Sequence, residues 1–258
     1  MTSNMKKEWW PTKILQQEAS TPYAIVVLNV QLNEKVLSIV VNNASLLVCA
    51  DAGADRYRAF QSSNNAASSR RPDVIIGDLD SVSEDTLNHY RSQGVVITKD
   101  PDQYSSDLTK SLKWIRNRFS ELYGTESEAD VLVVGSLSGR VDQAFSQVHH
   151  LYLADHNTDL LRGNAYLLSD TNISFLLSQG LNRIHVSREL FDEACGVLPI
   201  AGRTVISMTG FEWDVVDWPT EFGGQISTSQ YWRSDLLQIE VKGPNPLFTL
   251  ELAKAIQG

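Results

Sequence analysis

The sequence predicts an α/β fold: a parallel-sheet α/β domain over residues 23–162, followed by an all-β sandwich domain over residues 163–258. Up to about residue 160, short apolar runs alternate with longer amphipathic stretches, the rhythm of β-α units around a parallel sheet. The apolar runs are rich in Val, Ile and Leu without clean alternation, as expected for strands covered on both faces. After Gly163 the pattern changes to short β-type runs punctuated by Gly and Pro. Residues 1–22 are predicted to form an N-terminal extension.

The expected elements of the α/β domain are five strands with helices in the gaps. The strands are expected at 24–29, 46–51, 74–77, 95–99 and 131–135. Ser83, followed by two acidic residues, opens a helix that Gly94 closes, and Gly124 ends a second helix. The second domain has β-type runs at 165–169, 183–186, 204–209, 237–241 and 248–252, without a convincing helix between them.

Composition and charge exclude several classes of protein. The 22 basic and 31 acidic residues leave a formal net charge of −9, which argues against a nucleic-acid partner, because phosphate-backbone binding needs a broad basic face. The apolar runs are too short for a membrane span, so no membrane association is expected. The two cysteines have no metal-ligand spacing and no multi-bridge pattern. A cytoplasmic protein is the resulting expectation.

Polar and acidic residues follow each predicted strand of the first domain. The strands lead into Asn29, Asp51, and the segments 77–81 (GDLDS), 100–107 (DPDQYSSD) and 135–142 (GSLSGRVD). Ligands of open parallel sheets bind beyond the carboxyl ends of the strands. Several carboxylates at one edge would repel one another and would each be costly to desolvate without a hard cation between them. The sequence therefore predicts a Mg²⁺ site that a nucleotide completes.

Two features of the same edge suit phosphate oxygens. The glycine-rich turn at 135–139 exposes backbone N–H groups before a helix, and Arg140 adds a guanidinium that can bind two oxygens at once. Lys110 lies one helical turn after Asp107 and can reach the same place. Simpler interpretations stay open for single residues: Asp80, Asp107 and Asp142 each also suit a helix N-cap.

Three acidic segments resemble the motifs of eukaryotic, fungal-type thiamin pyrophosphokinases: 49–56 (CADAGADR), 72–81 (PDVIIGDLDS) and 102–110 (DQYSSDLTK). Further matches are 28–29, 135–143, 195–200, 222–224 with 227–229, and 246–249. The resemblance spans roughly residues 23–252. Ala52, Ser106, Gln230 and Phe248 depart mildly from the family pattern, in which Gly, Thr, Asn and Trp are commoner.

The resemblance implies an ATP-binding α/β catalytic domain, a β-sandwich domain that binds thiamin and dimerises, and a homodimer whose active sites draw on both subunits. It assigns Mg²⁺ to Asp78, Asp80 and Asp107, with Asp51 nearby as support for the metal or its water network, and it implies that all four aspartates are catalytic. The residues implied at the ATP site are Asn29, Gln103, Ser106, Lys110, Arg140 and Asp142. Those implied at the thiamin site are Ser227, Ser229 and Trp232.

The implied reaction is thiamin diphosphokinase chemistry: the thiamin hydroxyl attacks the β-phosphorus of ATP and AMP departs. The sequence does not choose between Asp78 and Asp107 as the group that accepts the hydroxyl proton. A metal-dependent phosphohydrolase acting on a nucleotide or a thiamin phosphate would use the same acidic edge, with water as the nucleophile. A non-catalytic sensor of nucleotide or thiamin is the third hypothesis; the retention of four acidic positions disfavours it, since binding an anion alone would not need them.

Overall fold

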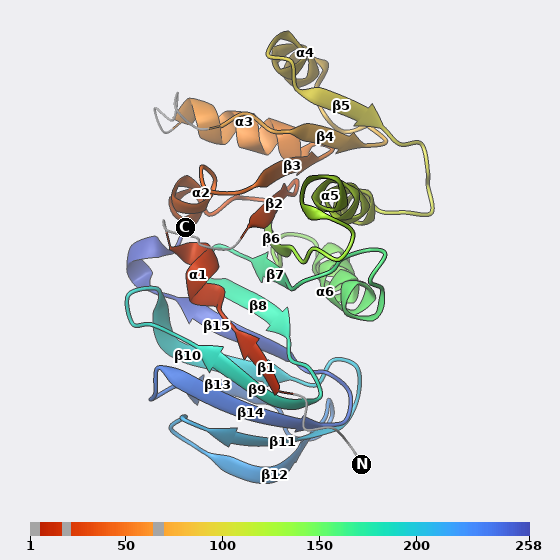
Figure 1. Cartoon of the computed structure of the whole chain (residues 1–258). Helices are drawn as coiled ribbons and strands as arrows, with labels where there is room; N and C mark the ends of the chain where they lie inside the picture. Colours follow the sequence, from red (N-terminus) through yellow and green to blue (C-terminus); the bar gives the residue numbers. More distant parts are fainter. Residues whose placement is uncertain (1–5, 17–21, 64–69) are drawn as a thin grey trace. The chain divides into compact units, whose positions relative to one another are not determined.

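The computed structural model describes residues 6–16, 22–63 and 70–258, and the chain divides into two compact units (Figure 1). The first, here the α/β unit, comprises Gln16–Asp170 with Gly258; the second, here the β unit, comprises Met1–Leu15 with Thr171–Gln257. Parts of the predicted N-terminal extension, residues 1–5 and 17–21, lie outside the described residues. Residues 6–15 do not stand apart as an extension: they form a strand and a short helix of the β unit.

The α/β unit is built on a parallel sheet with the strand order β7-β6-β2-β3-β4-β5. The strands are β2 (Tyr23–Val27), β3 (Leu46–Ala50), β4 (Val74–Gly77), β5 (Val96–Lys99), β6 (Asp130–Val134) and β7 (Ala165–Leu168). All five expected strands are present. The sixth, β7, falls in the predicted second domain, but it pairs in parallel with β6. The units therefore divide after Asp170 rather than near residue 162.

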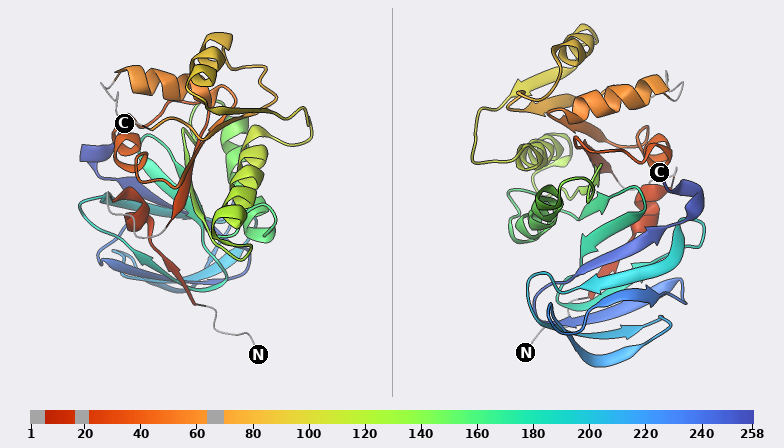
Figure 2. Two further views of the ribbon diagram at one scale, coloured as in Figure 1. Left: turned by 45° about the horizontal axis from the view of Figure 1, so that its top comes forward. Right: turned by 180° about the vertical axis from the view of Figure 1, so that it is seen from behind.

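Five helices flank this sheet: α2 (Glu34–Val40), α3 (Gly53–Ser63), α4 (Glu84–Ser92), α5 (Asp107–Tyr123) and α6 (Val141–His156). Figure 1 and Figure 2 show α5 and α6 on one face of the sheet and α2 and α3 on the other. The chain winds outward from β2 through β3 and β4 to β5, then returns to β6 on the other side of β2. The reversal lies between β2 and β6, and in open α/β sheets such a point is where ligands bind.

Serine side chains begin two of these helices. The Ser83 hydroxyl accepts the N–H of Thr86 at the start of α4, as the sequence predicts. The Ser106 hydroxyl accepts the N–H of Thr109 at 3.1 Å at the start of α5. Ser106 is thus the N-cap, and Asp107 is the first residue of the helix, so its carboxylate is not needed for capping.

The β unit is a two-sheet sandwich, as the sequence predicts. One sheet has the order β1-β9-β14-β11-β12 and the other the order β13-β10-β15-β8. Their strands are β1 (Lys6–Trp9), β8 (Asn172–Leu176), β9 (Gly180–His185), β10 (Phe191–Leu198), β11 (Thr204–Thr209), β12 (Val215–Thr220), β13 (Ser227–Tyr231), β14 (Leu236–Lys242) and β15 (Leu247–Leu252). Two short helices, α1 (Pro11–Leu15) and η1 (Lys254–Ile256), complete the unit. Within the described parts of the chain, no helix has the length and apolar character that crossing a bilayer requires.

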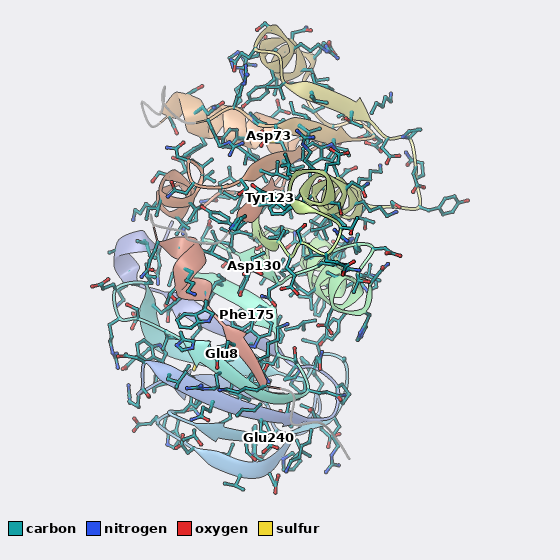
Figure 3. All side chains as sticks on the ribbon, in the orientation of Figure 1. Glu8, Asp73, Tyr123, Asp130, Phe175 and Glu240 are labelled. Carbon is teal, nitrogen blue, oxygen red and sulfur yellow. The ribbon has the colours of Figure 1, made fainter. Side chains whose placement is uncertain are left out.

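Strand β1 belongs to the sandwich core. It pairs in parallel with β9, and Glu8, which Figure 3 labels, accepts hydrogen bonds from Arg183 and His185 of that strand. Trp9 is buried; its ring lies 4.7 Å from that of Phe175 in the opposite sheet. The Trp9 indole N–H donates to the Asn182 side chain, which is itself fully buried. Strand β1 therefore contributes a buried aromatic residue, Trp9, to the core of the sandwich.

Trp9→Ala should reduce the free energy of unfolding of the β unit by about 3–5 kcal/mol, because it removes a buried aromatic ring and leaves a cavity. The neighbouring Trp10 is a matched control: it is 37% exposed and stacks on His185, so Trp10→Ala should cost about 1 kcal/mol. Urea denaturation of both variants measures the difference. Equal, small losses would contradict a core role for β1.

Candidate active site

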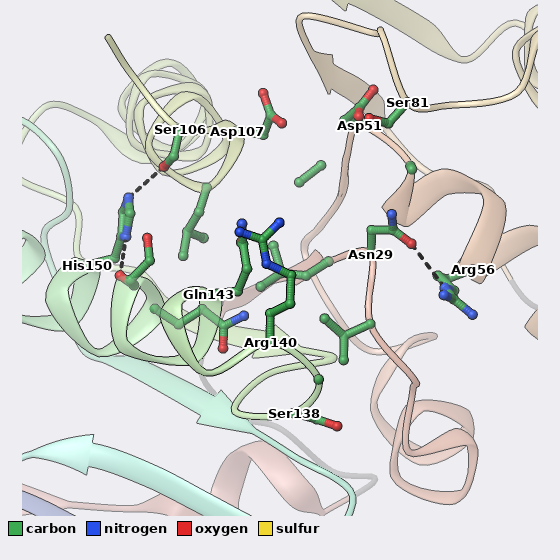
Figure 4. Close-up of a pocket in the computed structure, with 18 of the residues that line it drawn as sticks. Asn29, Asp51, Arg56, Ser81, Ser106, Asp107, Ser138, Arg140, Gln143 and His150 are labelled. Carbon is green, nitrogen blue, oxygen red and sulfur yellow. Dashed lines mark hydrogen bonds between the residues drawn. The ribbon is translucent and has the colours of Figure 1, made fainter. Parts of the chain in front are cut away.

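A cavity of about 740 Å³ opens at the carboxyl ends of the α/β unit's strands (Figure 4). Its wall is formed by Leu28–Gln31 after β2, by residues 50–52 at the end of β3, by 106–108 at the start of α5, by 138–140 before α6, and by four side chains of α6. These segments surround the point between β2 and β6 where the winding of the sheet reverses. The cavity therefore lies where the topology of the sheet predicts a ligand site.

Three carboxylates meet beside this cavity. Asp51 follows β3, Asp78 follows β4 and Asp107 begins α5, and one oxygen from each lies within 4.8 Å of the others. Asp51 is only 6% exposed, and its Oδ1 has no hydrogen-bond partner among the residues that the structure describes. Its backbone is left-handed, with φ of 44°, a conformation that costs a non-glycine residue energy and is typical of functional sites.

Gly77 allows the carboxylates to approach one another. A Cβ atom at this position would lie 2.9 Å from the Cβ of Asp51 and 3.0 Å from Oδ1 of Asp107. Any larger residue at the end of β4 would push these two side chains away. The sequence Gly77-Asp78 thus supplies one carboxylate and the space for the other two.

The pKa values of the three carboxyls reflect their burial, their hydrogen bonds and their mutual repulsion. Burial raises the pKa of Asp51 and of Asp107, and the neighbouring carboxylates raise both further. Partial burial also acts on Asp78, but hydrogen bonds from the Gln103 amide and the Asp80 backbone outweigh it and lower the pKa of that carboxyl. An acid with a raised pKa is less stable in its ionised form than in water, so the ionised Asp51 and Asp107 carboxylates destabilise the fold.

The triad fits a divalent cation with oxygen ligands. Ligand oxygens on opposite sides of a Mg²⁺ ion are ~4.2 Å apart, because each Mg–O bond is about 2.1 Å. The three oxygens already lie within 4.8 Å, and the unpartnered Asp51 Oδ1 provides a buried acceptor. Carboxylates are the protein ligands that Mg²⁺ commonly takes.

Asp80 does not join this group. The strand ends at Gly77, and Leu79 has φ of 59°, so the two-residue alternation of a strand does not continue to Asp80. The Asp80 side chain is exposed and accepts the Ser81 hydroxyl at 2.8 Å. The structure therefore gathers Asp51, Asp78 and Asp107, whereas the resemblance assigned the metal to Asp78, Asp80 and Asp107, with Asp51 in support.

Two residues expected at the ATP site instead hold the triad. Lys110 is 3% exposed; its ammonium donates to the Asp100 carbonyl at 3.0 Å and to Asp107 Oδ1 at 3.3 Å, and it does not line the cavity. Gln103 donates its amide to Asp78 Oδ2 at 3.3 Å. Both side chains orient carboxylates, so a direct contact between Lys110 and phosphate is not supported by this geometry.

The other residues expected at the ATP site lie at or beside the cavity. Asn29 lines it and accepts a hydrogen bond from Arg56 at 3.0 Å. Arg140 lines it as well, and its guanidinium makes two hydrogen bonds to Asp142, an exposed residue of the first turn of α6. Ser106 lies on the opposite wall. Asp142 thus lies beside the cavity and contacts two of its lining residues, Arg140 and the backbone N–H of Gln143.

The turn before α6 is held in an unusual backbone shape. Gly135, Leu137 and Gly139 all have positive φ, and the N–H of Leu137 donates to the Gln147 side chain at 2.6 Å. Arg140 is the N-cap of α6, and its side chain accepts no hydrogen bond from the first backbone N–H groups of the helix; the N–H of Gln143 donates instead to Asp142 at 3.0 Å. Such N–H groups are suited to an anion.

Several polar cavity residues were not among the expected site residues, and they include Arg56, Gln143, Gln147 and His150. Arg56 belongs to the acidic segment 49–56, in which only Asp51 was assigned a site role from the sequence. The other three follow Arg140 at intervals of three or four residues, the spacing of one helix face. Polar residues at that spacing indicate a polar helix face, and this pattern could have predicted the wall of the cavity.

The β unit has its own surface cavity of about 370 Å³. It is lined by Ser227, Thr228 and Ser229 of β13 and by the indole rings of Trp213 and Trp218. Trp213 is 55% exposed, and the Gln230 side chain fixes its backbone through two hydrogen bonds. The Ser227 and Ser229 positions expected from the sequence are therefore in a cavity with aromatic walls.

Trp232 does not line this cavity. It is 1% exposed, its indole N–H donates to the Asp192 carbonyl, and the Arg188 guanidinium lies 4.3 Å from its ring centre. Its faces are occupied by the protein's own atoms. This is the packing role that the sequence left open, and the expected stacking surface is absent at this residue.

Fold and site together define a class: an α/β unit with an acidic site at the carboxyl ends of its parallel strands, joined in one chain to a β-sandwich unit with an aromatic cavity. Two family models match the chain: "Thiamin pyrophosphokinase, catalytic domain" over residues 37–161 and "Thiamin pyrophosphokinase, vitamin B1 binding domain" over residues 181–243. The chain belongs to the thiamin pyrophosphokinase family.

Individual relatives agree with this assignment. The chain is 32% identical to thiamine pyrophosphokinase 1 of Arabidopsis thaliana, over 93% of this chain and 90% of that protein. It is 28% identical to the Saccharomyces cerevisiae thiamine pyrophosphokinase, over 74% of this chain and 72% of that protein. The crystal structure of yeast thiamin pyrophosphokinase shares the fold, with a TM-score of 0.83 and 23% identity over 98% of this chain and 92% of that one.

Asp51→Asn should raise the melting temperature of the metal-free protein at neutral pH, because an amide removes one repelling charge and donates to the neighbouring carboxylates. The folded-state pKa of Asp51 is raised, so the wild type loses stability as pH rises above the ordinary aspartate pKa of about 3.9. The gain should therefore shrink as pH falls towards that value. Thermal melts in a chelator measure it, with the exposed Asp80→Asn as the control. A lower melting temperature for Asp51→Asn would contradict the account.

Proposed function

We propose that this chain transfers the diphosphate group of Mg²⁺-bound ATP to the hydroxyl of thiamin, giving thiamin diphosphate and AMP. The observation that carries the proposal is the acidic triad of Asp51, Asp78 and Asp107, of which Asp51 is buried, beside a cavity in a chain of the thiamin pyrophosphokinase family. Catalysis of this kind rests on alignment and on neutralising phosphate charge, and the cavity's residues supply the groups for both.

Asp51, Asp78 and Asp107 would hold the Mg²⁺ ion, which when bound supplies positive charge to the phosphate oxygens. Lys110 and Gln103 keep two of these carboxylates in place. The proposed metal set replaces Asp80 with Asp51, because the geometry favours it. Asp78 and Asp107 remain the two alternatives for accepting the hydroxyl proton.

ATP would occupy the cavity of about 740 Å³, with its phosphates towards the turn at 135–139 and the Arg140 guanidinium. Asp142 fixes Arg140 through two hydrogen bonds, which presents the guanidinium in one orientation. Asn29 and Ser106 offer polar groups on opposite walls. The thiamin oxygen then bonds to the β-phosphorus, the bond from that phosphorus to the bridging oxygen breaks, and AMP leaves with the electron pair.

Thiamin would bind at the cavity of the β unit, whose residues fall inside the segment matched by the vitamin B1 binding model. The exposed indole of Trp213 offers a face for the flat pyrimidine and the cationic thiazolium. The hydroxyls of Ser227 and Ser229 are available to the pyrimidine edge. We therefore propose Trp213, in place of Trp232, as the aromatic contact.

The cavities for the two substrates are lined by different units, so the reaction needs a β-unit cavity to face an α/β-unit cavity. We propose a homodimer in which the thiamin segment of one subunit serves the acidic site of the other, as the resemblance implies. We also propose a cytoplasmic location, the expectation from the sequence.

Product analysis tests the proposed reaction. The purified protein with ATP and Mg²⁺ should form AMP and thiamin diphosphate in equal amounts only when thiamin is added. ADP with thiamin monophosphate would identify transfer of a single phosphoryl group. Phosphate release without thiamin would favour the phosphohydrolase, and substrate binding without turnover would favour a sensor.

Trp213→Ala should weaken thiamin binding roughly tenfold, the equivalent of about 1.4 kcal/mol, while ATP binding stays unchanged. Trp213→Phe keeps an aromatic face and should retain most of the affinity. Trp232→Ala should instead lower the melting temperature, because it removes a buried ring. Calorimetric titration of thiamin into each folded variant measures the first effect. Wild-type thiamin affinity in Trp213→Ala would show that Trp213 does not contact thiamin.

A further inference from the structure

His150 is a buried titratable residue on the wall of the acidic cavity that the proposed chemistry does not use. It lies on α6 and is 6% exposed. Figure 4 shows its ring between the Ser106 side chain and the backbone of its own helix, with a hydrogen bond to each. It thus links α6 to the loop that begins α5.

Its hydrogen bonds determine which ring nitrogen carries the proton. Nδ1 lies 2.6 Å from the carbonyl oxygen of Ser146, and a carbonyl oxygen only accepts, so Nδ1 is the donor. Nε2 is then an acceptor in the neutral ring. Burial lowers the pKa of His150, which favours this neutral form.

The acceptor nitrogen faces two hydroxyl groups of the α5 start. Ser106 Oγ lies 2.6 Å from Nε2, and Thr109 Oγ1 lies 2.9 Å from it. Because Ser106 Oγ already accepts the Thr109 N–H as the helix cap, its own proton is available to donate to His150. The imidazole therefore accepts from the hydroxyls at the start of α5 and holds the capping hydroxyl of Ser106 in place; the Thr109 hydroxyl, 3.1 Å from Ser106 Oγ, completes this group.

The residue after Ser106 is Asp107, which supplies one carboxylate of the triad. A shift of the cap moves the first residue of α5, and with it this carboxylate. The same helix α6 holds a second wall of the cavity one turn earlier, where Gln147 accepts the Leu137 N–H at 2.6 Å. Helix α6 thus holds two ligand-facing loops through buried polar side chains.

We propose that His150 is a positioning residue, which sets the place of the Asp107 carboxylate through the Ser106 hydroxyl and so sets the affinity of the acidic site for its divalent cation. The inference rests on the proposed function only in taking the triad as the cation site. It gives His150 no contact with substrate.

Two substitutions separate this role from simple packing. In His150→Gln the side-chain amide reaches the position of Nε2 and can accept from Ser106. In His150→Asn the amide reaches only the position of Nδ1, so it keeps the Ser146 contact and loses the Ser106 contact. The two differ by one methylene group. His149→Asn is the matched control, since its ring is exposed.

Mn²⁺ serves as the probe, measured by electron paramagnetic resonance with α,β-methylene ATP, which lacks the cleavable bridge oxygen. His150→Asn should weaken Mn²⁺ binding by about tenfold, the usual loss when a group that orients a metal ligand is removed. His150→Gln and His149→Asn should bind Mn²⁺ as the wild type does. In turnover, His150→Asn should lower kcat and leave the KM for thiamin unchanged.

Wild-type Mn²⁺ affinity in His150→Asn would overturn the proposal, and so would equal losses in the Asn and Gln variants. Should His150→Asn fail to fold, Ser106→Gly takes its place, with Mn²⁺ binding measured without nucleotide because Ser106 also lines the cavity. Glycine is tolerated at a helix N-cap, so this variant keeps the imidazole and removes the Ser106 link. It should show the same loss, and wild-type affinity there would overturn the proposal. The Mn²⁺ measurement needs no turnover. An inactive wild type whose Mn²⁺ binding still depends on His150 would sink the proposed reaction and leave this inference standing.

Discussion

The mutual repulsion of three aspartates is the constraint around which the edge of the α/β unit is built. Asp51, Asp78 and Asp107 come from three segments far apart in the sequence, and two of them are substantially buried with raised pKa values. The surrounding structure forces this arrangement. Gly77 leaves room for the carboxylates, and hydrogen bonds from Lys110 and Gln103 hold two of them. The backbone of Asp51 has a strained, left-handed conformation. Gathering these carboxylates lowers the stability of the cation-free fold, and a cation bound at the site explains why the arrangement exists.

The fold was largely predictable because its signals are local. The strands of the parallel sheet are continuous apolar runs, and Ser83 marks a helix start in the way that capping chemistry requires. The strand at β7 was predicted but placed in the second domain, and residues 6–9, which form β1, were predicted to belong to an extension, since their partners, β6 and β9, are distant in sequence. Pairing between distant segments leaves no mark in a short window of residues.

The site was predictable to the level of the acidic edge but not to the choice of ligands. The resemblance assigned Asp80 to the cation together with Asp78, but the left-handed Leu79 ends the alternation of the strand, and Asp80 lies exposed beyond it. Lys110 points inward to Asp107, which helical spacing alone does not reveal. Trp213 and Trp232 are both tryptophans beside β13, and only burial distinguishes the exposed ring from the packed one.

The central claim is that the three aspartates hold the divalent cation that meets the phosphates of ATP. Crystals grown with Mn²⁺ and α,β-methylene ATP test it through the anomalous scattering of manganese. The account predicts a manganese peak at bonding distance from oxygens of the Asp51, Asp78 and Asp107 group and from the nucleotide's phosphates. A peak bound by phosphate oxygens alone, or by Asp80 without this group, would contradict it.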